Sequence, residues 1–126
     1  MAKHFMSFQH NISNKPSVFC LMGPTGTGKS SAAIELARQY PIEIINCDSM
    51  QVYRGLDIGT AKVPQSKRDE IPHHLIDIRD QDQPYSAANF SDDARACVEA
   101  IHQRNHIPLL VGGTGLYFRF FQNGYK

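Results

Sequence analysis

The sequence lacks several features that would assign a protein to a broad class at once. No stretch approaches the roughly 20 apolar residues that a membrane-spanning helix needs. The first 16 residues are polar and do not contain the apolar core of a secretory signal. Internal repeats and low-complexity segments are also absent. We therefore expect a cytoplasmic protein with no membrane association.

An excess of charge of one sign is missing too. The 13 lysine and arginine residues face 12 aspartate and glutamate residues, which gives a net charge of +1. This balance provides no general electrostatic argument for nucleic-acid binding. The apolar share of 41% in 126 residues is ordinary for one globular domain.

Cysteine is scarce, with only Cys20, Cys47 and Cys97. Their spacings fit neither a zinc site nor a CxxC redox pair. We interpret all three as small buried side chains, and an odd number of free thiols suits a reducing cytoplasm.

What the chain does have, after a polar tail at residues 1–16, is an alternation of apolar strands and amphipathic helices in residues 17–126. The pattern predicts strands at residues 17–22, 42–47, 74–78 and 108–111, and helices at residues 29–40, 87–101 and 116–121. Residues 48–72 are predicted to be a loop, with a short helix near residues 50–54. Strands that alternate with helices indicate an α/β fold with a parallel sheet, whose ligands bind at the carboxyl ends of the strands.

Each of the predicted helices has an apolar side, which in the middle helix carries Phe90, Ala94, Cys97, Val98 and Ile101. The face expected to be buried carries Ala33, Leu36, Ala37 and Tyr40 in the first helix. The aromatic residues of the last helix are expected in the core or on the wall of an apolar pocket. They are Tyr117, Phe118, Phe120 and Phe121.

Residues 23–30 read GPTGTGKS and match the P-loop pattern G-x-x-x-x-G-K-[ST] at every fixed position. Glycines let successive backbone N–H groups turn toward a phosphate, and the following helix offers its positive end. The predicted phosphate-binding residues are Gly23, Pro24, Thr25, Gly26, Thr27, Gly28, Lys29 and Ser30. The Ser30 hydroxyl is placed to bind Mg²⁺. Kinases, NTPases and several transferases share this motif, so it does not define the reaction.

Asp48 follows the second predicted strand directly. A carboxylate at this edge of the sheet faces the phosphate, where it could accept a proton or help to hold Mg²⁺. Ser49 and Gln51 could form hydrogen bonds with a substrate base. The alternative is that Asp48 only caps a short helix.

The third candidate is the GGTG turn at residues 112–115, after the last predicted strand. Its glycines allow a close backbone approach and leave the Thr114 hydroxyl exposed to a ligand. The alternative is an ordinary strand-to-helix turn that Thr114 caps.

His73 and His74 are adjacent and could suggest a metal pair. Neighbouring residues of a strand point to opposite faces, however. We therefore favour structural roles for both.

These segments together resemble the tRNA dimethylallyltransferase (tRNA isopentenyltransferase) family. The resemblance rests on GPTGTGKS at residues 23–30, DSMQVYRGLDIGTAK at 48–62, IPHHLID at 71–77, YSAANF at 85–90 and VGGTGLY at 111–117. Their order and spacing match as well, and they span almost all of residues 19–120. The segment that begins at Asp48 is the most diagnostic, because nucleotide kinases with a similar P-loop lack it.

The resemblance implies a P-loop NTPase-like fold and a specific reaction. Family members move a dimethylallyl group from dimethylallyl diphosphate to N6 of an adenosine beside the tRNA anticodon. It implies that residues 25–30 bind the diphosphate, that Ser30 holds Mg²⁺, and that Asp48 is the general base. Thr114 would contact the reacting region. The residues implied to meet the adenosine are Asp48, Ser49, Met50 and Gln51.

Family members are more than twice as long as this chain. We therefore expect an amino-terminal part that lacks the tRNA-gripping insertion, the carboxyl-terminal region and an arginine for the diphosphate. We also expect a monomer that does not modify tRNA by itself. The alternatives are a small-molecule kinase that binds ATP, an adenylate isopentenyltransferase, and a phosphate-binding remnant without catalytic activity.

Overall fold

The structure is a computed structural model that describes residues 17–23, 28–55 and 62–124. The polar tail predicted at residues 1–16 lies outside the described residues. So do Pro24, Thr25, Gly26 and Thr27 of the predicted P-loop.

The described residues form a four-stranded sheet in which every pairing is parallel. Its strands are β1 (Phe19–Met22), β2 (Ile42–Asn46), β3 (His73–His74) and β4 (Ile107–Gly112), in the spatial order β1-β4-β2-β3. Because β4 lies between β1 and β2, the connection from β1 to β2 crosses over it. The predicted α/β fold with a parallel sheet is confirmed.

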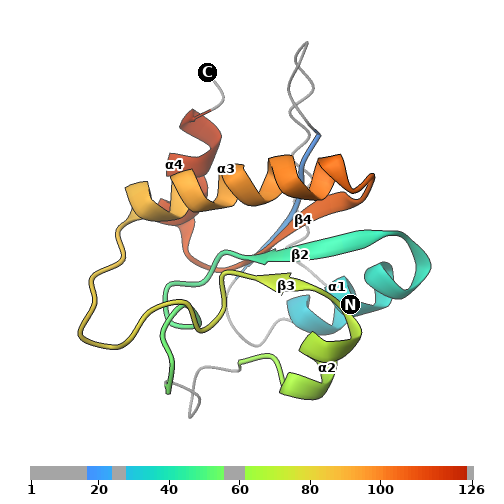
Figure 1. The fold of residues 1–126 in the computed structure, drawn as a ribbon, viewed down its shortest axis with the longest axis horizontal. Coiled ribbons are helices and arrows are strands. Elements are labelled where there is room, and N and C mark those ends of the chain that lie inside the picture. Colours follow the sequence, from blue (N-terminus) through green and yellow to red (C-terminus); the bar gives the residue numbers. More distant parts are fainter. Residues whose placement is uncertain (1–16, 24–27, 56–61, 125–126) are drawn as a thin grey trace.

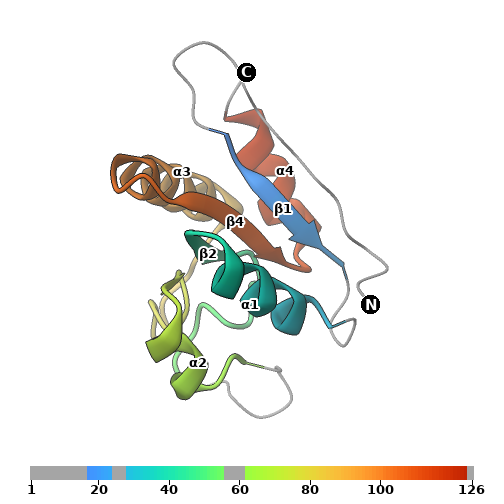
Figure 2. The ribbon, with the colours of Figure 1, turned by 90° about the vertical axis from the view of Figure 1, so that its right-hand side faces the viewer.

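Helices cover both faces of this sheet. They are α1 (Lys29–Gln39), α2 (Gln65–Glu70), α3 (Ala87–Gln103) and α4 (Gly115–Asn123). Figure 1 shows α3 and α4 on one side of the strands and α1 and α2 on the other. In the view turned by 90°, β1 and β4 lie between α4 and α1 (Figure 2).

Each face of the sheet has its own apolar core. The larger cluster joins β1, β2 and β4 to α3 and α4, and its fully buried members include Cys20, Ile45, Phe90, Leu110 and Phe121. The smaller cluster packs the opposite side chains of the same strands against α1, and it includes Leu21, Ala33, Ile44 and Leu109. The alternation along each strand produces the two layers.

Three predicted elements differ from the structure. Residues 50–54 form turns and an isolated bridge between Tyr53 and Arg79 instead of a helix. The third strand is only His73–His74, because Leu75 (φ 67°) and Asp77 (φ 56°) adopt left-handed backbone conformations that end it. The expected loop also contains α2, which buries no residue.

Several side chains also test the predicted burial. Cys20 and Cys47 are buried and Cys97 is half-buried, each as a free thiol. Tyr40 is 54% exposed and does not extend the buried face of α1 as predicted, because the helix ends at Gln39. Phe120 is 43% exposed, while the other aromatic residues of α4 are buried. Within the described parts, no helix has the length and apolar character to cross a membrane.

Candidate functional site

The carboxyl ends of β1, β4 and β2 are joined by backbone hydrogen bonds, so the three predicted site segments begin side by side. The Gly23 amide donates to the Gly112 carbonyl at 3.1 Å, just after β1. The Cys47 amide, just after β2, donates to the Val111 carbonyl at 2.8 Å. Ligands of open α/β sheets bind at this edge.

Gly112 permits the close approach of two of these segments. A Cβ atom at this position would lie 2.2 Å from the Cys47 carbonyl oxygen, so any side chain would force the backbones apart. The GGTG turn was expected to let the backbone approach something closely. The structure shows that its neighbour is the backbone just before Asp48.

Thr114 connects the third segment to the second. Its Oγ1 accepts a hydrogen bond from the Ser49 amide at 2.9 Å, and its own amide donates to the Cys47 carbonyl at 3.1 Å. Thr114 stands at the N-cap position of α4, but its side chain forms no capping bond there. The hydroxyl therefore holds the backbone that carries Asp48.

A pocket of about 200 Å³ opens at this edge between α1 and the ends of β2 and β4. Gly28, Lys29, Ser30, Asp48 and Gln51 are the predicted site residues that line it. Gly28 has φ 81°, a conformation that favours glycine, and it is the N-cap residue of α1. The pocket thus combines the start of a helix, an ammonium group, a hydroxyl and a carboxylate.

The other predicted site residues lie elsewhere. Gly23, Ser49, Met50 and Thr114 are not among the described lining residues, and Met50 is 49% exposed. Gly23, Ser49 and Thr114 take part in the hydrogen bonds that join the strand ends.

Lys29 and Asp48 are close enough to influence each other. Burial lowers the pKa of the Lys29 ammonium group, and the negative charge of Asp48 opposes this shift. Lys29 is 9% exposed. A cation at the start of α1 and an anion just after β2 therefore line the same pocket.

Asp48 also organises its own backbone. Its Oδ1 accepts a hydrogen bond from the Met50 amide at 2.8 Å. The carboxylate thus closes a turn, and the short helix that Asp48 was suggested to cap does not form. This bond fixes the carboxylate without removing it from the pocket.

Sequence reasoning missed Asn46, which also lines the pocket. This 4% exposed side chain donates through Nδ2 to the carbonyls of Asp48, at 3.1 Å, and Leu75, at 3.0 Å. The available signal was the sequence of the strand itself: in Ile42–Asn46, Asn46 and Glu43 are the polar residues of a run that is predicted to be buried. Asn46 joins the Asp48 backbone to the turn after β3.

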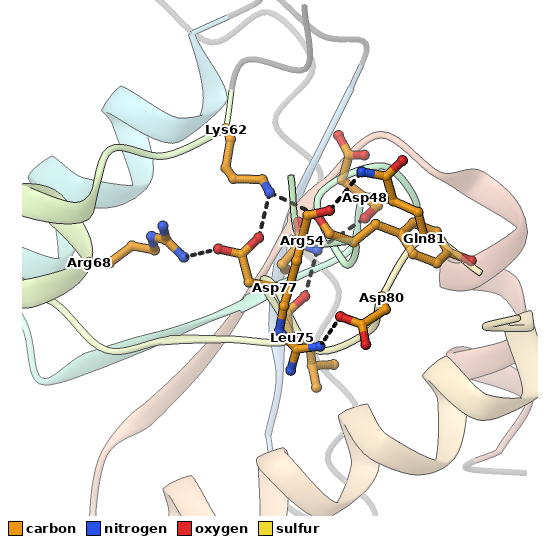
Figure 3. A network of polar contacts seen from close by, with 10 residues as sticks. Asp48, Arg54, Lys62, Arg68, Leu75, Asp77, Asp80 and Gln81 are labelled. Carbon is orange, nitrogen blue, oxygen red and sulfur yellow. Dashed lines mark hydrogen bonds and ion pairs between the residues drawn. The ribbon is translucent and has the colours of Figure 1, made fainter. Parts of the chain in front are cut away.

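A charged network lies next to the segment that contains Asp48. Lys62 and Arg68 each contact one carboxylate oxygen of Asp77, as Figure 3 shows, and the Lys62 ammonium also donates to the Tyr53 carbonyl at 2.9 Å. Burial alone would raise the pKa of Asp77, but the hydrogen bonds from Lys62 and Arg68 outweigh it and lower the pKa below its usual range. The side chain of Lys62 is 5% exposed, that of Arg68 is 19% exposed and that of Asp77 is 30% exposed.

The two adjacent histidines have structural contacts, as predicted. His73 lines the pocket and bonds through Nδ1 to the Ile71 carbonyl at 2.7 Å, and burial lowers its pKa. His74 bonds instead to Glu43 at 2.7 Å. Among the described residues, no group of three or more histidine, cysteine or acidic side chains could hold a metal ion.

A parallel sheet, a first strand followed by a helix that starts after a glycine, and a carboxylate at the end of β2 are typical of a P-loop NTPase-like fold. A sequence model of a family described as IPP transferase matches residues 51–126. The chain therefore belongs to the IPP transferase family, as the resemblance of its motifs indicated.

Curated relatives extend the comparison to most of the chain. A tRNA dimethylallyltransferase of Halorhodospira halophila is 56% identical over 85% of this chain and 34% of its own length. One from Nitrosomonas europaea is 53% identical over 90% of this chain and 36% of its own length. The chain thus spans about a third of the length of these relatives.

Solved structures agree on the fold. The full-length tRNA isopentenylpyrophosphate transferase of Bacillus halodurans matches with a TM-score of 0.77 and 48% identity, over 81% of this chain and 34% of that one. A eukaryotic dimethylallyltransferase described as acting on tRNA matches with a TM-score of 0.78 and 41% identity, over 82% of this chain and 26% of that one.

Proposed function

We propose that this chain supplies the diphosphate-binding half of a tRNA dimethylallyltransferase site. The reaction would move a dimethylallyl group from dimethylallyl diphosphate to N6 of an adenosine next to the tRNA anticodon. The observation that carries the proposal is the shared pocket, which Lys29 and Ser30 of α1 line together with Asp48 at the end of β2. The names of the relatives support the choice of this reaction over other P-loop chemistry.

The P-loop would bind the leaving diphosphate. Breaking the carbon–oxygen bond leaves the bonding electrons on the departing diphosphate, so its negative charge grows. The Lys29 ammonium and the amides at the start of α1 are fixed donors that stabilise such charge. The remaining predicted phosphate-binding residues, at positions 24–27, lie outside the described residues.

Asp48 would act as the general base. The amine of adenine is a weak nucleophile because its lone pair is delocalised into the ring. A carboxylate that takes the N6 proton as the new carbon–nitrogen bond forms would lower the barrier. The bond from the Met50 amide orients Asp48 for this role, and Gln51 lines the same pocket.

Thr114, Ser49 and Met50 do not line the pocket, so their proposed roles differ from that of Asp48. Thr114 would act near the reacting region by holding Ser49, since its hydroxyl accepts from the Ser49 amide. Met50 is 49% exposed, so its side chain would be accessible to the base. The base must leave its stack to enter, at a cost of a few kcal/mol.

Mg²⁺ would bind at Ser30. The hydroxyl of Ser30 and the carboxylate of Asp48 line the same pocket, and oxygen ligands of this kind suit Mg²⁺. When bound with the diphosphate, the ion would neutralise part of the charge of the leaving group. We also propose that the enzyme acts in the cytoplasm as a monomer.

Calorimetric titration with dimethylallyl diphosphate and with ATP, each with Mg²⁺, tests the proposal on this chain without tRNA. We expect the prenyl diphosphate to bind more tightly. Lys29→Met should weaken its binding about 10- to 100-fold, since a charge-assisted hydrogen bond contributes about 1.5–3 kcal/mol. Lys67→Met, on α2 and away from the pocket, is the matched control and should bind as the unmodified chain does.

Tighter binding of ATP would instead favour a small-molecule kinase. Equal effects of the two lysine substitutions would show that the pocket does not hold the diphosphate. No binding of either ligand to a chain that melts cooperatively would overturn the proposal.

A further inference from the structure

We propose that Asp77 is a positioning residue that holds the Asp48 segment, residues 48–51, in place beside the pocket. Asp77 would act through its backbone amide and through Lys62, and it touches no substrate. The inference rests on the proposed function, because residues 48–51 are those proposed to meet the adenosine.

The backbone around Asp77 pairs with the end of the Asp48 segment. The Asp77 amide donates to the Gln51 carbonyl at 3.0 Å. The amides of Ile78 and Arg79 donate to the Val52 carbonyl at 2.8 and 3.0 Å. This short pairing replaces the helix that the sequence suggested, and it fixes the carboxyl-terminal end of the Asp48 segment.

The side chain of Asp77 secures the same stretch through Lys62. The Lys62 side chain is only 5% exposed, and its ammonium group bridges the Asp77 carboxylate and the Tyr53 carbonyl (Figure 3). A lysine this deeply buried is stable only beside a counter-charge. Neutralising Asp77 would therefore remove one of the contacts that hold Lys62 beside the backbone at Tyr53.

The amino-terminal end of the Asp48 segment is held by the same turn. Asn46 links the carbonyls of Asp48 and Leu75, and Leu75 begins the left-handed turn that Asp77 completes. Leucine rarely adopts φ 67°, so surrounding contacts must maintain this conformation. Both ends of the Asp48 segment thus depend on residues 75–77.

Native-state amide exchange by NMR tests the proposal in the 126-residue chain without any substrate. Asp77→Asn removes the charge alone, because asparagine keeps the size and tolerates the left-handed backbone of Asp77. Lys62→Met keeps an apolar stem but loses the ammonium group, and Lys62→Arg restores a cationic donor. Asp80→Asn is the matched control, since Asp80 forms an exposed ion pair in the same loop.

We expect the amides of Ser49 and Met50 to exchange roughly 10- to 100-fold faster in Asp77→Asn and Lys62→Met, the factor that follows from losing one charge-assisted hydrogen bond. Their resonances should also move, which a change in global stability alone would not cause. Lys62→Arg should restore both, Asp80→Asn should change neither, and the amides of β4 should keep their rates.

Wild-type exchange at Ser49 and Met50 in both variants would overturn the proposal, and so would an equal acceleration throughout the sheet. The affinity for dimethylallyl diphosphate should stay within about twofold of wild type in Asp77→Asn, because a positioning residue touches no substrate. If the unmodified chain binds no prenyl diphosphate, the proposed function fails, and the exchange rates still decide whether Asp77 holds the Asp48 segment.

Discussion

Replacing Glu43 by glutamine would remove a buried negative charge at the end of the sheet opposite the pocket. Glu43 lies on β2 and is 2% exposed. Its carboxylate accepts two hydrogen bonds from Arg104, at 2.7 and 2.8 Å, and contacts His74 and His106, each at 2.7 Å. One side chain thus joins β2 to β3 and to the chain between α3 and β4.

The pKa of Glu43 gives the size of the effect. The hydrogen bonds from Arg104 lower this pKa, burial opposes them, and the two histidines add to the lowering, so that it falls from its ordinary value of 4.5 to about 2. Such a shift corresponds to roughly 3 kcal/mol of folding stability. This stability is fully present above pH 4.5 and is lost as the pH falls toward 2.

Urea unfolding at a series of pH values measures the effect. Glu43→Gln should lose about 3 kcal/mol at pH 7, and the difference from wild type should shrink to about 1.5 kcal/mol near pH 3. Glu99→Gln, which changes an exposed glutamate of α3, should differ from wild type by less than about 0.5 kcal/mol. A loss below about 1 kcal/mol in Glu43→Gln, or an unchanged dependence on acid, would refute the reasoning.

Two further substitutions address the strand ends. Gly112→Ala should lower the free energy of unfolding by about 1–3 kcal/mol, because the new Cβ would lie 2.2 Å from the Cys47 carbonyl oxygen. Urea unfolding measures this loss, with Gly115→Ala as the control because a Cβ at Gly115 meets nothing within 4 Å. Equal losses in the two variants would contradict the prediction. Thr114→Val should speed exchange of the Ser49 amide about fivefold, because it removes the acceptor of a hydrogen bond that contributes about 1 kcal/mol. Thr114→Ser keeps the hydroxyl and should show wild-type exchange, and a fast Ser49 amide in both variants would contradict the assigned bond.

The sheet and the start of the P-loop helix could be predicted because local signals define them. Apolar runs mark β1, β2 and β4 within one or two residues, and α1 begins at Lys29, where the motif places it. The convergence of Lys29 and Asp48 on one pocket followed from the rule that ligands bind at the carboxyl ends of parallel strands. These predictions need only the alternation of elements and the identity of a few residues.

The segment between β2 and β3 could not be predicted in the same way. Helix α2 has no buried residue, so no apolar pattern reveals it. Its contacts with the rest of the fold include the Arg68–Asp77 and Arg38–Glu70 ion pairs, which join residues 9 and 32 positions apart. Such pairs depend on the finished fold, and the sequence alone does not say which partners will meet.

Strand β2 shows where the limit lies. Its sequence IEIIN contains two polar residues, Glu43 and Asn46, which alternate to opposite faces of the sheet. Since both are almost fully buried, each requires partners, and that much follows from the sequence once the strand is accepted as buried. Glu43 pairs with the cationic side chain of Arg104 on the face that α3 covers, whereas Asn46 binds the backbone of Asp48 beside the pocket. A polar residue in an apolar strand therefore indicates a specific polar contact. Its position along the strand indicates the role of that contact: Glu43, near the start of β2, supports the fold, whereas Asn46, at the carboxyl end, lies beside the pocket.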